Sequence, residues 1–174
     1  MQKTLGFLLI FLSAWIALPS TSQALISISA DAPVSYSMSH PAFGDVSTTG
    51  IIVGFSVPIL PGFGYEKLNM TGKVHGIKFR NNITMYDLFY GLPVPVVNIR
   101  LGVGLGKGEM EDNLGTQYNP ATYYQYYGSL GYPVFGILDL HLGYHVVAGH
   151  VTIAGGGDED LDAKMVTLGA MLAF

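Results

Sequence analysis

The strongest pattern along the chain is an alternation of apolar and polar residues with a period of two. It is clearest in four segments: 26–38, 97–106, 137–146 and 165–174. In the second segment Val97, Ile99 and Leu101 alternate with polar or small residues. Successive side chains of a β-strand point to opposite faces, so this pattern predicts strands with one apolar face. Each run is about 10–13 residues long, whereas strands of soluble proteins usually have about 5–6.

Four further segments alternate less regularly: 48–57, 63–71, 81–90 and 122–132. The second of these is the least regular, because Glu66, Lys67 and Asn69 cannot all lie on one face. Together the eight segments predict an all-β protein with eight antiparallel strands.

The connections between the predicted strands are of two alternating kinds. Short apolar connections with proline fall at 58–62, 92–95 and 132–136. Longer polar connections fall at 40–47, 72–80, 107–121 and 148–162. Transmembrane β-barrels have this asymmetry, with short turns at one end and longer loops at the other. The sequence therefore predicts an eight-stranded antiparallel transmembrane up-and-down β-barrel.

The composition indicates which face of this barrel is apolar. The chain is 49% hydrophobic and only 11% charged, whereas soluble domains carry about 25% charged residues. A soluble barrel of the lipocalin type, the main alternative, would need charges on its outside. The interior of an eight-stranded barrel is just wide enough for side chains to fill it. We therefore expect the apolar face outside, against lipid, and the polar face inside.

The N-terminus resembles a secretory signal. A positive start at Lys3 precedes the apolar run Leu5–Leu18, and Ser22 and Ala24 are small residues at the positions that a signal peptidase reads. We expect residues 1–24 to be removed and residues 25–174 to form the barrel. The remaining seven basic and twelve acidic residues give a net charge of −5, which argues against nucleic acid as a partner. The absence of cysteine excludes a lipoprotein and disulfide bonds.

The whole predicted barrel resembles the small eight-stranded outer-membrane proteins of Gram-negative bacteria, the OmpA, OmpX and OmpW type. Its last strand places Val166, Leu168, Leu172 and the terminal Phe174 at alternate positions. This pattern is similar to the signal that the barrel-assembly machinery reads in that class. The resemblance implies insertion by that machinery, location in the outer membrane, and contact with its lipids and lipopolysaccharide. We expect a monomer without a cofactor.

The predicted interior contains most of the candidate site residues. They are Asp31, Glu66, Asp87, Arg100, Asp139, His141 and His145. Buried charges are costly unless they are paired, so we expect Arg100 to bridge lumen carboxylates, with Asp139 the first candidate. These residues would then form a structural plug. Two alternatives are a gated narrow pore lined by the same groups and a proton-sensing role for the two histidines.

Acidic residues and histidines in the predicted loops are candidate metal ligands. Glu109, Glu111 and Asp112 lie in the third loop, and Asp158, Asp160 and Asp162 in the fourth. The last three have the first ligand spacings of an EF-hand, but glycine and glutamate are missing at the sixth and twelfth positions, Ala163 and Gly169. We therefore expect no dedicated calcium site. Looser cation binding at the lipopolysaccharide surface remains an alternative, as does zinc at His40, His75 and His150.

A lipid-modifying enzyme is a remote alternative. Ser39 precedes His40, and His145 or His150 could supply a base, but no GxSxG motif frames a serine. We therefore expect a protein without enzymatic activity. Its predicted role is structural or interactive, in stabilising the membrane or presenting loops, and the main alternative is a narrow channel for small or hydrophobic solutes.

Tyrosines near the predicted strand ends suit the headgroup level of a membrane. They are Tyr90, Tyr123, Tyr124, Tyr126, Tyr127, Tyr132 and Tyr144.

Overall fold

The computed structural model describes most of the chain after the predicted signal. It describes residues 25–39, 46–74, 76–92, 94, 96–116, 118–152 and 158–174. The predicted signal (1–24) and two of the candidate zinc ligands, His40 and His75, lie outside the described residues. No helix in these ranges is long and apolar enough to cross a membrane.

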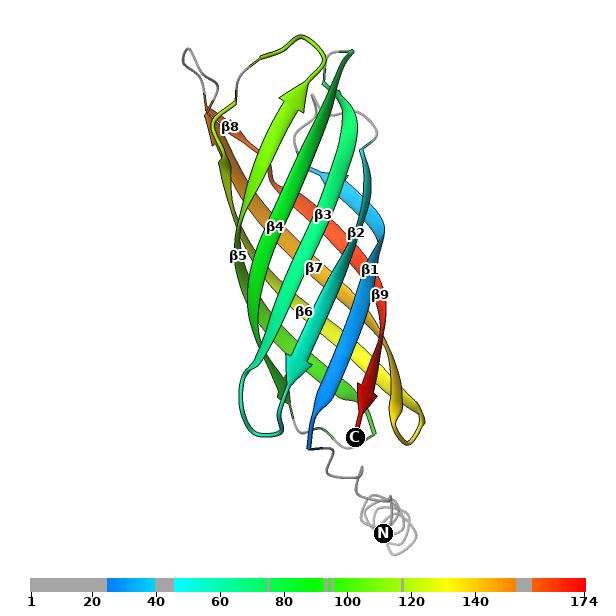
Figure 1. Ribbon diagram of the computed structural model, residues 1–174. Coiled ribbons are helices and arrows are strands. Elements are labelled where there is room, and N and C mark those ends of the chain that lie inside the picture. The colour runs from blue at the N-terminus through cyan, green and yellow to red at the C-terminus, as the bar shows by residue number, and fades with distance from the viewer. Residues whose placement is uncertain are drawn as a thin grey trace, which may run out of the picture.

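The described chain forms one closed antiparallel barrel (Figure 1). Its strands are β1 (Ser27–Met38), β2 (Ser47–Ser56), β3 (Gly62–Val74), β4 (Ile77–Leu92), β5 (Asn98–Asp112), β6 (Ala121–Phe135), β7 (Leu138–Thr152), β8 (Asp158–Asp160) and β9 (Ala163–Ala173). Each long strand pairs with the next, while the three-residue β8 only extends the hairpin after β7. β9 pairs with both β7 and β1, which closes the ring. The predicted eight-stranded antiparallel up-and-down barrel is therefore confirmed.

The last residue of the chain takes part in this closure. Phe174 and Ile26 exchange two backbone hydrogen bonds, at 2.9 and 3.0 Å. β1 begins and β9 ends at the same end of the barrel, where the three short turns also lie (Figure 1). We call this the turn end, and the opposite end the loop end.

The strands extend further toward the loop end than the sequence pattern predicts. β3 continues to Val74, β4 begins at Ile77 and β5 continues to Asp112. Most of the predicted loop 72–80 and the first part of 107–121 are therefore strand. At the turn end, β6 continues to Phe135, so the third turn is shorter than the predicted 132–136.

The polarity of the two faces reverses about half-way along the barrel. Near the turn end, outward side chains are apolar, as in Leu101, Val103 and Leu105 of β5, which are all about half exposed. Further along the same strand the outward residues are Lys107 and Glu109. We call the first part the turn half (62–66 of β3, 86–92 of β4 and 98–105 of β5, with the neighbouring parts of the other strands), and the remainder the loop half.

The interior reverses in the opposite sense. In the loop half it is a hydrophobic core of residues that are almost completely buried, among them Leu68, Met70, Ile83, Met85, Tyr123, Val147 and Met165. In the turn half the inward side chains are mostly polar. The predicted arrangement, apolar outside and polar inside, therefore holds for the turn half and is wrong for the loop half. Because the apolar residues change from the outward to the inward positions, the alternation is interrupted at the border between the two halves. The sequence pattern therefore predicts polar loops for the loop halves of β3, β4 and β5.

The same reversal separates the tyrosines. Tyr90, Tyr124, Tyr126, Tyr132 and Tyr144 point outward and are exposed. Tyr123 is completely buried in the core, and Tyr127 points into the lumen, where its ring stacks on His145. For these two the predicted place at the headgroup level is wrong.

Candidate functional site: the polar interior of the turn half

The structure brings all seven predicted polar residues into the lumen of the turn half. They come from five strands: Asp31 from β1, Glu66 from β3, Asp87 from β4, Arg100 from β5, and Asp139, His141 and His145 from β7. Six of them are buried, with Glu66 completely so, and Arg100 is half-buried. Their contacts divide them into two clusters and a separate arginine.

The first cluster, which we call the Asp31 cluster, is centred on a histidine. The Nε2 atom of His141 lies 2.5 Å from Asp31 Oδ1, and its Nδ1 atom lies 3.5 Å from Asp139 Oδ1. The amide of Asn98 donates to the other carboxylate oxygen of Asp139. The imidazole thus lies between two carboxylates and is hydrogen-bonded to that of Asp31, a contact that lowers the cost of burying this group.

The second cluster, which we call the Glu66 cluster, is centred on a glutamine. The Nε2 atom of Gln125 donates to Glu66 Oε1 at 2.6 Å and to Asp87 Oδ1 at 2.7 Å. Its Oε1 atom lies 3.1 Å from His145 Nδ1, and His145 Nε2 lies 3.3 Å from the hydroxyl of Thr167. An amide oxygen only accepts, so Nδ1 of this histidine carries the proton. One neutral side chain therefore ties two buried carboxyl groups to a histidine.

Arg100 is held by hydroxyl groups instead of carboxylates. Its Nε and Nη1 atoms donate to Ser129 and Ser29, each at 3.1 Å. Within the described ranges no carboxylate oxygen lies within 4.0 Å of the guanidinium, since the ion pairs at that distance all involve histidines. The predicted bridge from Arg100 to Asp139 is therefore wrong, because Asp139 is already bound within the Asp31 cluster.

Side chains fill the space around these clusters. The guanidinium of Arg100 lies 5.7 Å from the ring centre of Phe89, and the rings of Tyr127 and His145 stack at 4.6 Å. The cavity that remains between them has a volume of about 20 Å³, enough for about one water molecule. A side chain at Gly104 would collide with the Glu66 cluster, so this cluster fits only beside a glycine.

Sequence reasoning missed the uncharged members of the site. They are Ser29, Asn98, Gln125, Ser129 and Thr167. Each occupies an inward position of its strand, so the alternation could have placed them in the lumen. Their role as hydrogen-bond partners depends on which strands face each other across it, and the alternation carries no information about that.

The candidate enzyme residues do not come together. Both ring nitrogens of His145 lie at hydrogen-bond distance from lumen side chains, and His150 is exposed, with its Nδ1 atom 3.0 Å from Asp160. The backbone N–H of Ser39 donates to the carbonyl of Asp162 at 2.8 Å. Among the residues that the structure describes, no serine hydroxyl is hydrogen-bonded to a histidine.

The described residues contain no group of three or more histidine, aspartate or glutamate side chains placed to hold a metal ion. Two of the three predicted zinc positions, His40 and His75, lie outside these ranges.

Asp112 has a structural role at the end of β5. Its Oδ1 atom accepts hydrogen bonds from the backbone N–H groups of Leu114 (2.9 Å) and Thr116 (3.0 Å), and its Oδ2 atom accepts from the hydroxyl of Tyr118 (3.1 Å). The hydrogen bond from the Thr116 side chain, supported by these others, lowers the pKa of the Asp112 carboxyl from 3.8 to about 2. This acid therefore stabilises its own loop in the ionised form.

No protein-family model matches the sequence, and no curated protein matches it. Several solved structures do resemble the barrel. The crystal structure of Neisserial surface protein A matches 86% of this chain and 97% of its own, with a TM-score of 0.63 and 15% identity. The chain has the fold of the small eight-stranded outer-membrane barrels.

Two further structures have the same fold. The outer-membrane protein OprG from Pseudomonas aeruginosa matches with a TM-score of 0.51 and 10% identity, over 87% of this chain and 98% of its own. The outer-membrane protein AlkL, solved by solid-state NMR in lipid bilayers, matches with a TM-score of 0.50 and 12% identity, over 87% and 90%. At these identities the likeness concerns the fold, and it agrees with the apolar outer surface of the turn half.

The residues of the predicted assembly signal lie along β9 and just beyond its end. Leu168, Leu172 and Phe174 are exposed on the outer face, and Val166 is half-buried there. Their recognition by the assembly machinery stays a prediction.

Proposed function

We propose that the mature chain is an integral outer-membrane barrel with a closed interior and a structural or surface-interaction role. In this proposal it stabilises the membrane and presents its loops outside the cell. The observation that carries the proposal is that the described interior is filled with side chains in both halves.

Two kinds of packing support a closed interior. In the turn half the Asp31 and Glu66 clusters, Arg100 and the ring of Tyr127 occupy the lumen. In the loop half Met85, Tyr123 and Met165 are completely buried. A conducting barrel keeps a water-filled channel, so this packing favours a plug over a pore.

We also propose how the protein is exported and inserted into the outer membrane. The apolar outer face of the turn half contacts the lipids, and the ordered end of β9 with Phe174 serves as the signal for the assembly machinery. Residues 1–24 are removed on export, and the barrel is a monomer. Mass spectrometry of the protein extracted from outer membranes should give a mature chain that begins at Leu25.

Conductance in planar bilayers tests the closed interior. We expect no reproducible conductance steps from the purified barrel. A porin in the same bilayers is the positive control, because its barrel keeps a water-filled channel. Steps from the unchanged protein that disappear or shift in Arg100→Ala would contradict the proposal and favour the narrow channel.

A channel for hydrophobic solutes is the second candidate, and the apolar interior of the loop half favours it. Passage would require several buried side chains to move, because Leu68, Ile83 and Met85 are almost completely buried. Transport of an apolar dye into vesicles that contain the barrel would support this candidate. We expect the same slow uptake with and without the protein.

A further inference from the structure

The outer face of the loop half is basic on one side of the barrel. Five exposed cations lie on three adjacent strands: Lys67 and Lys73 on β3, Lys78 and Arg80 on β4, and Lys107 on β5. They are five of the seven basic residues that follow position 24. Of the other two, Arg100 is in the lumen and Lys164 is on β9, on the opposite side of the ring. We call the five residues the basic patch.

The basic patch has no carboxylate partners within the described ranges, where every ion pair within 4.0 Å involves a histidine. Lys73 lies directly opposite Lys78 in the register of β3 and β4. Like charges at directly opposed positions destabilise a sheet. Arg80 lies opposite Glu111 but forms no ion pair with it at that distance. Glu109 and Glu111 of β5 share this outer face, so it carries five positive and two negative side chains. The excess of positive charge is available to an external anion.

The edge of the basic patch nearer the turn end adjoins the lipid-facing surface. Lys67 follows Tyr65 by two residues and Lys107 follows Leu105 by two, so each is the next outward side chain along its strand. The rings of Tyr65 and Tyr86, 5.6 Å apart, lie at this border. Tyrosines mark the headgroup level of a membrane, so these two lysines lie where lipid phosphates are found.

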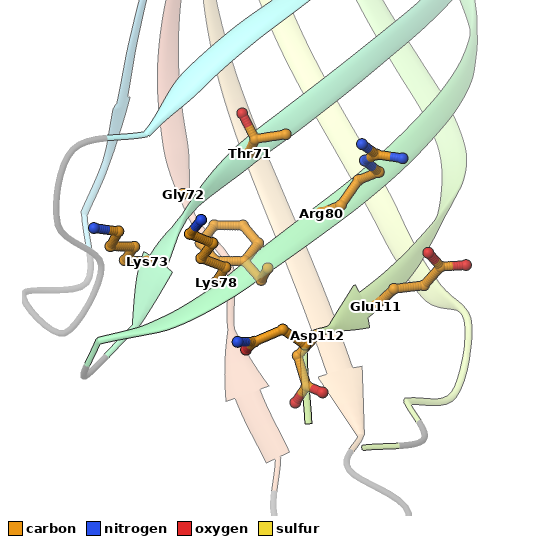
Figure 2. Close-up of a pocket in the computed structure, with 9 residues that line it drawn as sticks. Thr71, Gly72, Lys73, Lys78, Arg80, Glu111 and Asp112 are labelled. Carbon is orange, nitrogen blue, oxygen red and sulfur yellow. The ribbon is translucent and has the colours of Figure 1, made fainter. Parts of the chain in front are cut away.

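The other edge of the basic patch lies nearer the loop end of the same strands. Lys73 is six residues beyond Lys67 on β3, a separation of about 20 Å along the strand. Lys73, Lys78 and Arg80 line a hollow of about 670 Å³ at the loop end (Figure 2). Glu111 and Asp112 also line it, but the Asp112 carboxylate is bound within its own loop.

We propose that the basic patch binds the phosphate groups of lipopolysaccharide in the outer leaflet. Lys67 and Lys107 contact the phosphates of its lipid anchor, and Lys73, Lys78 and Arg80 contact phosphates higher in its headgroup. A phospholipid carries its phosphate at one level, whereas the patch offers cations at two levels. This inference rests on the proposed location of the barrel in the outer membrane.

Titration of the folded barrel with lipopolysaccharide, followed by native mass spectrometry, tests this site. Two multiple variants are used, Lys67→Gln with Lys107→Gln, and Lys73→Gln with Lys78→Gln and Arg80→Gln. At roughly 1 kcal/mol for each cation near a membrane surface, we expect each variant to bind about tenfold or more weakly. The affinity of the unchanged barrel should also fall as salt is added.

Lys164→Gln is the matched control for Lys107→Gln. Both residues are exposed lysines on the first outward positions beyond the apolar surface, but Lys164 lies on the opposite side of the barrel. We expect Lys107→Gln to weaken binding, and Lys164→Gln to change the affinity by no more than about twofold. All variants change exposed side chains, and circular dichroism of the strands verifies that each has folded.

Three results would overturn the inference. The first is equal loss of binding in Lys107→Gln and Lys164→Gln. The second is equal binding of lipopolysaccharide from which the phosphates have been removed. The third is binding of inorganic phosphate alone with the same affinity, which would assign the patch to free phosphate. If the unchanged barrel inserts into vesicles but gives any one of these results, the inference fails and the proposed function stands. If the barrel does not insert at all, both fail.

Discussion

The turn half and the loop half of this barrel are built from the same strands, yet their faces have opposite polarity. In the turn half the outward residues, such as Leu101 and Val103, are apolar and the lumen is polar. In the loop half the outward residues are mostly charged, such as Lys78 and Glu109, or polar, and the interior is a hydrophobic core. Each half resembles a different class of barrel, one suited to lipid and one suited to water.

This difference shows that the apolar face of a barrel strand can point outward in one half and inward in the other. In the loop half the apolar side chains bury each other, and in the proposed membrane location lipid covers those of the turn half. The two interiors are therefore stabilised in different ways. Hydrogen bonds hold the lumen of the turn half, and close packing of apolar side chains holds the core of the loop half.

The largest expected effect comes from a cavity in the core of the loop half. Leu68 is almost completely buried there, so Leu68→Ala should lower the free energy of unfolding by about 2–5 kcal/mol. Thr71→Ala, on the exposed face of the same strand, should change it by less than about 0.5 kcal/mol. Urea unfolding of the barrel in vesicles measures both. Equal effects of the two changes would mean that the loop half has no packed core.

The next effect comes from a charge on the outer face. Val103→Arg places a cation on the apolar outer face of the turn half and should cost about 2–4 kcal/mol if it lies near the middle of the bilayer. Glu109→Arg, three outward positions further along β5, should cost less than about 0.5 kcal/mol. The same unfolding assay compares them. A similar cost at both positions would contradict the change of surroundings between the halves.

A smaller effect is expected in the polar lumen. Gln125→Ala removes the amide that donates to both Glu66 and Asp87, which should lower the free energy of unfolding by about 1–3 kcal/mol. Asn82→Ala, which removes an exposed amide from the loop half, is the control and should have little effect. Equal stability of the two variants would show that the Glu66 cluster does not stabilise the turn half.

The smallest expected effect is local and depends on pH. Hydrogen bonds in the folded state hold the pKa of Asp112 at about 2, below its ordinary value of 3.8. The ionised carboxylate therefore stabilises its loop above that ordinary value, and this stabilisation is lost as the pH falls through about 2. Amide hydrogen exchange at Leu114 and Thr116 should be slower in the unchanged protein than in Asp112→Asn near neutral pH. This difference should disappear at the lowest pH, and its persistence there would contradict the assignment.

The sequence predicts the fold well where one face stays apolar along a strand. The alternation through Leu101, Val103 and Leu105 predicts β5, and the three short turns mark where one strand ends and the next begins. The sequence predicts the loop half poorly, because there the apolar residues occupy the inward positions instead of the outward ones. In β3, Glu66 points inward, while Lys67 points outward just beyond the apolar outer surface of the turn half. The segment 63–71 therefore fits neither pattern alone.

The candidate site follows from the sequence only in part. All seven charged or ionisable residues expected in the lumen lie there, since strand alternation fixes the face on which a side chain lies. Their partners could not be predicted, because these depend on contacts across the lumen. Arg100 contacts Ser29 from β1, 71 positions away in the sequence. The charge-pairing argument that linked Arg100 to Asp139 overlooked neutral partners such as Asn98.

The boundary between the two halves can be measured directly on β5. The chain contains no cysteine, so a spin label can be attached to single cysteines that replace Val103, Leu105, Lys107 and Glu109 in turn. In vesicles we expect the labels at Val103 and Leu105 to be reached by oxygen dissolved in the lipid. Those at Lys107 and Glu109 should be reached by a water-soluble nickel complex. Access of the nickel complex to Val103, or a lipid environment that continues to Glu109, would contradict the account.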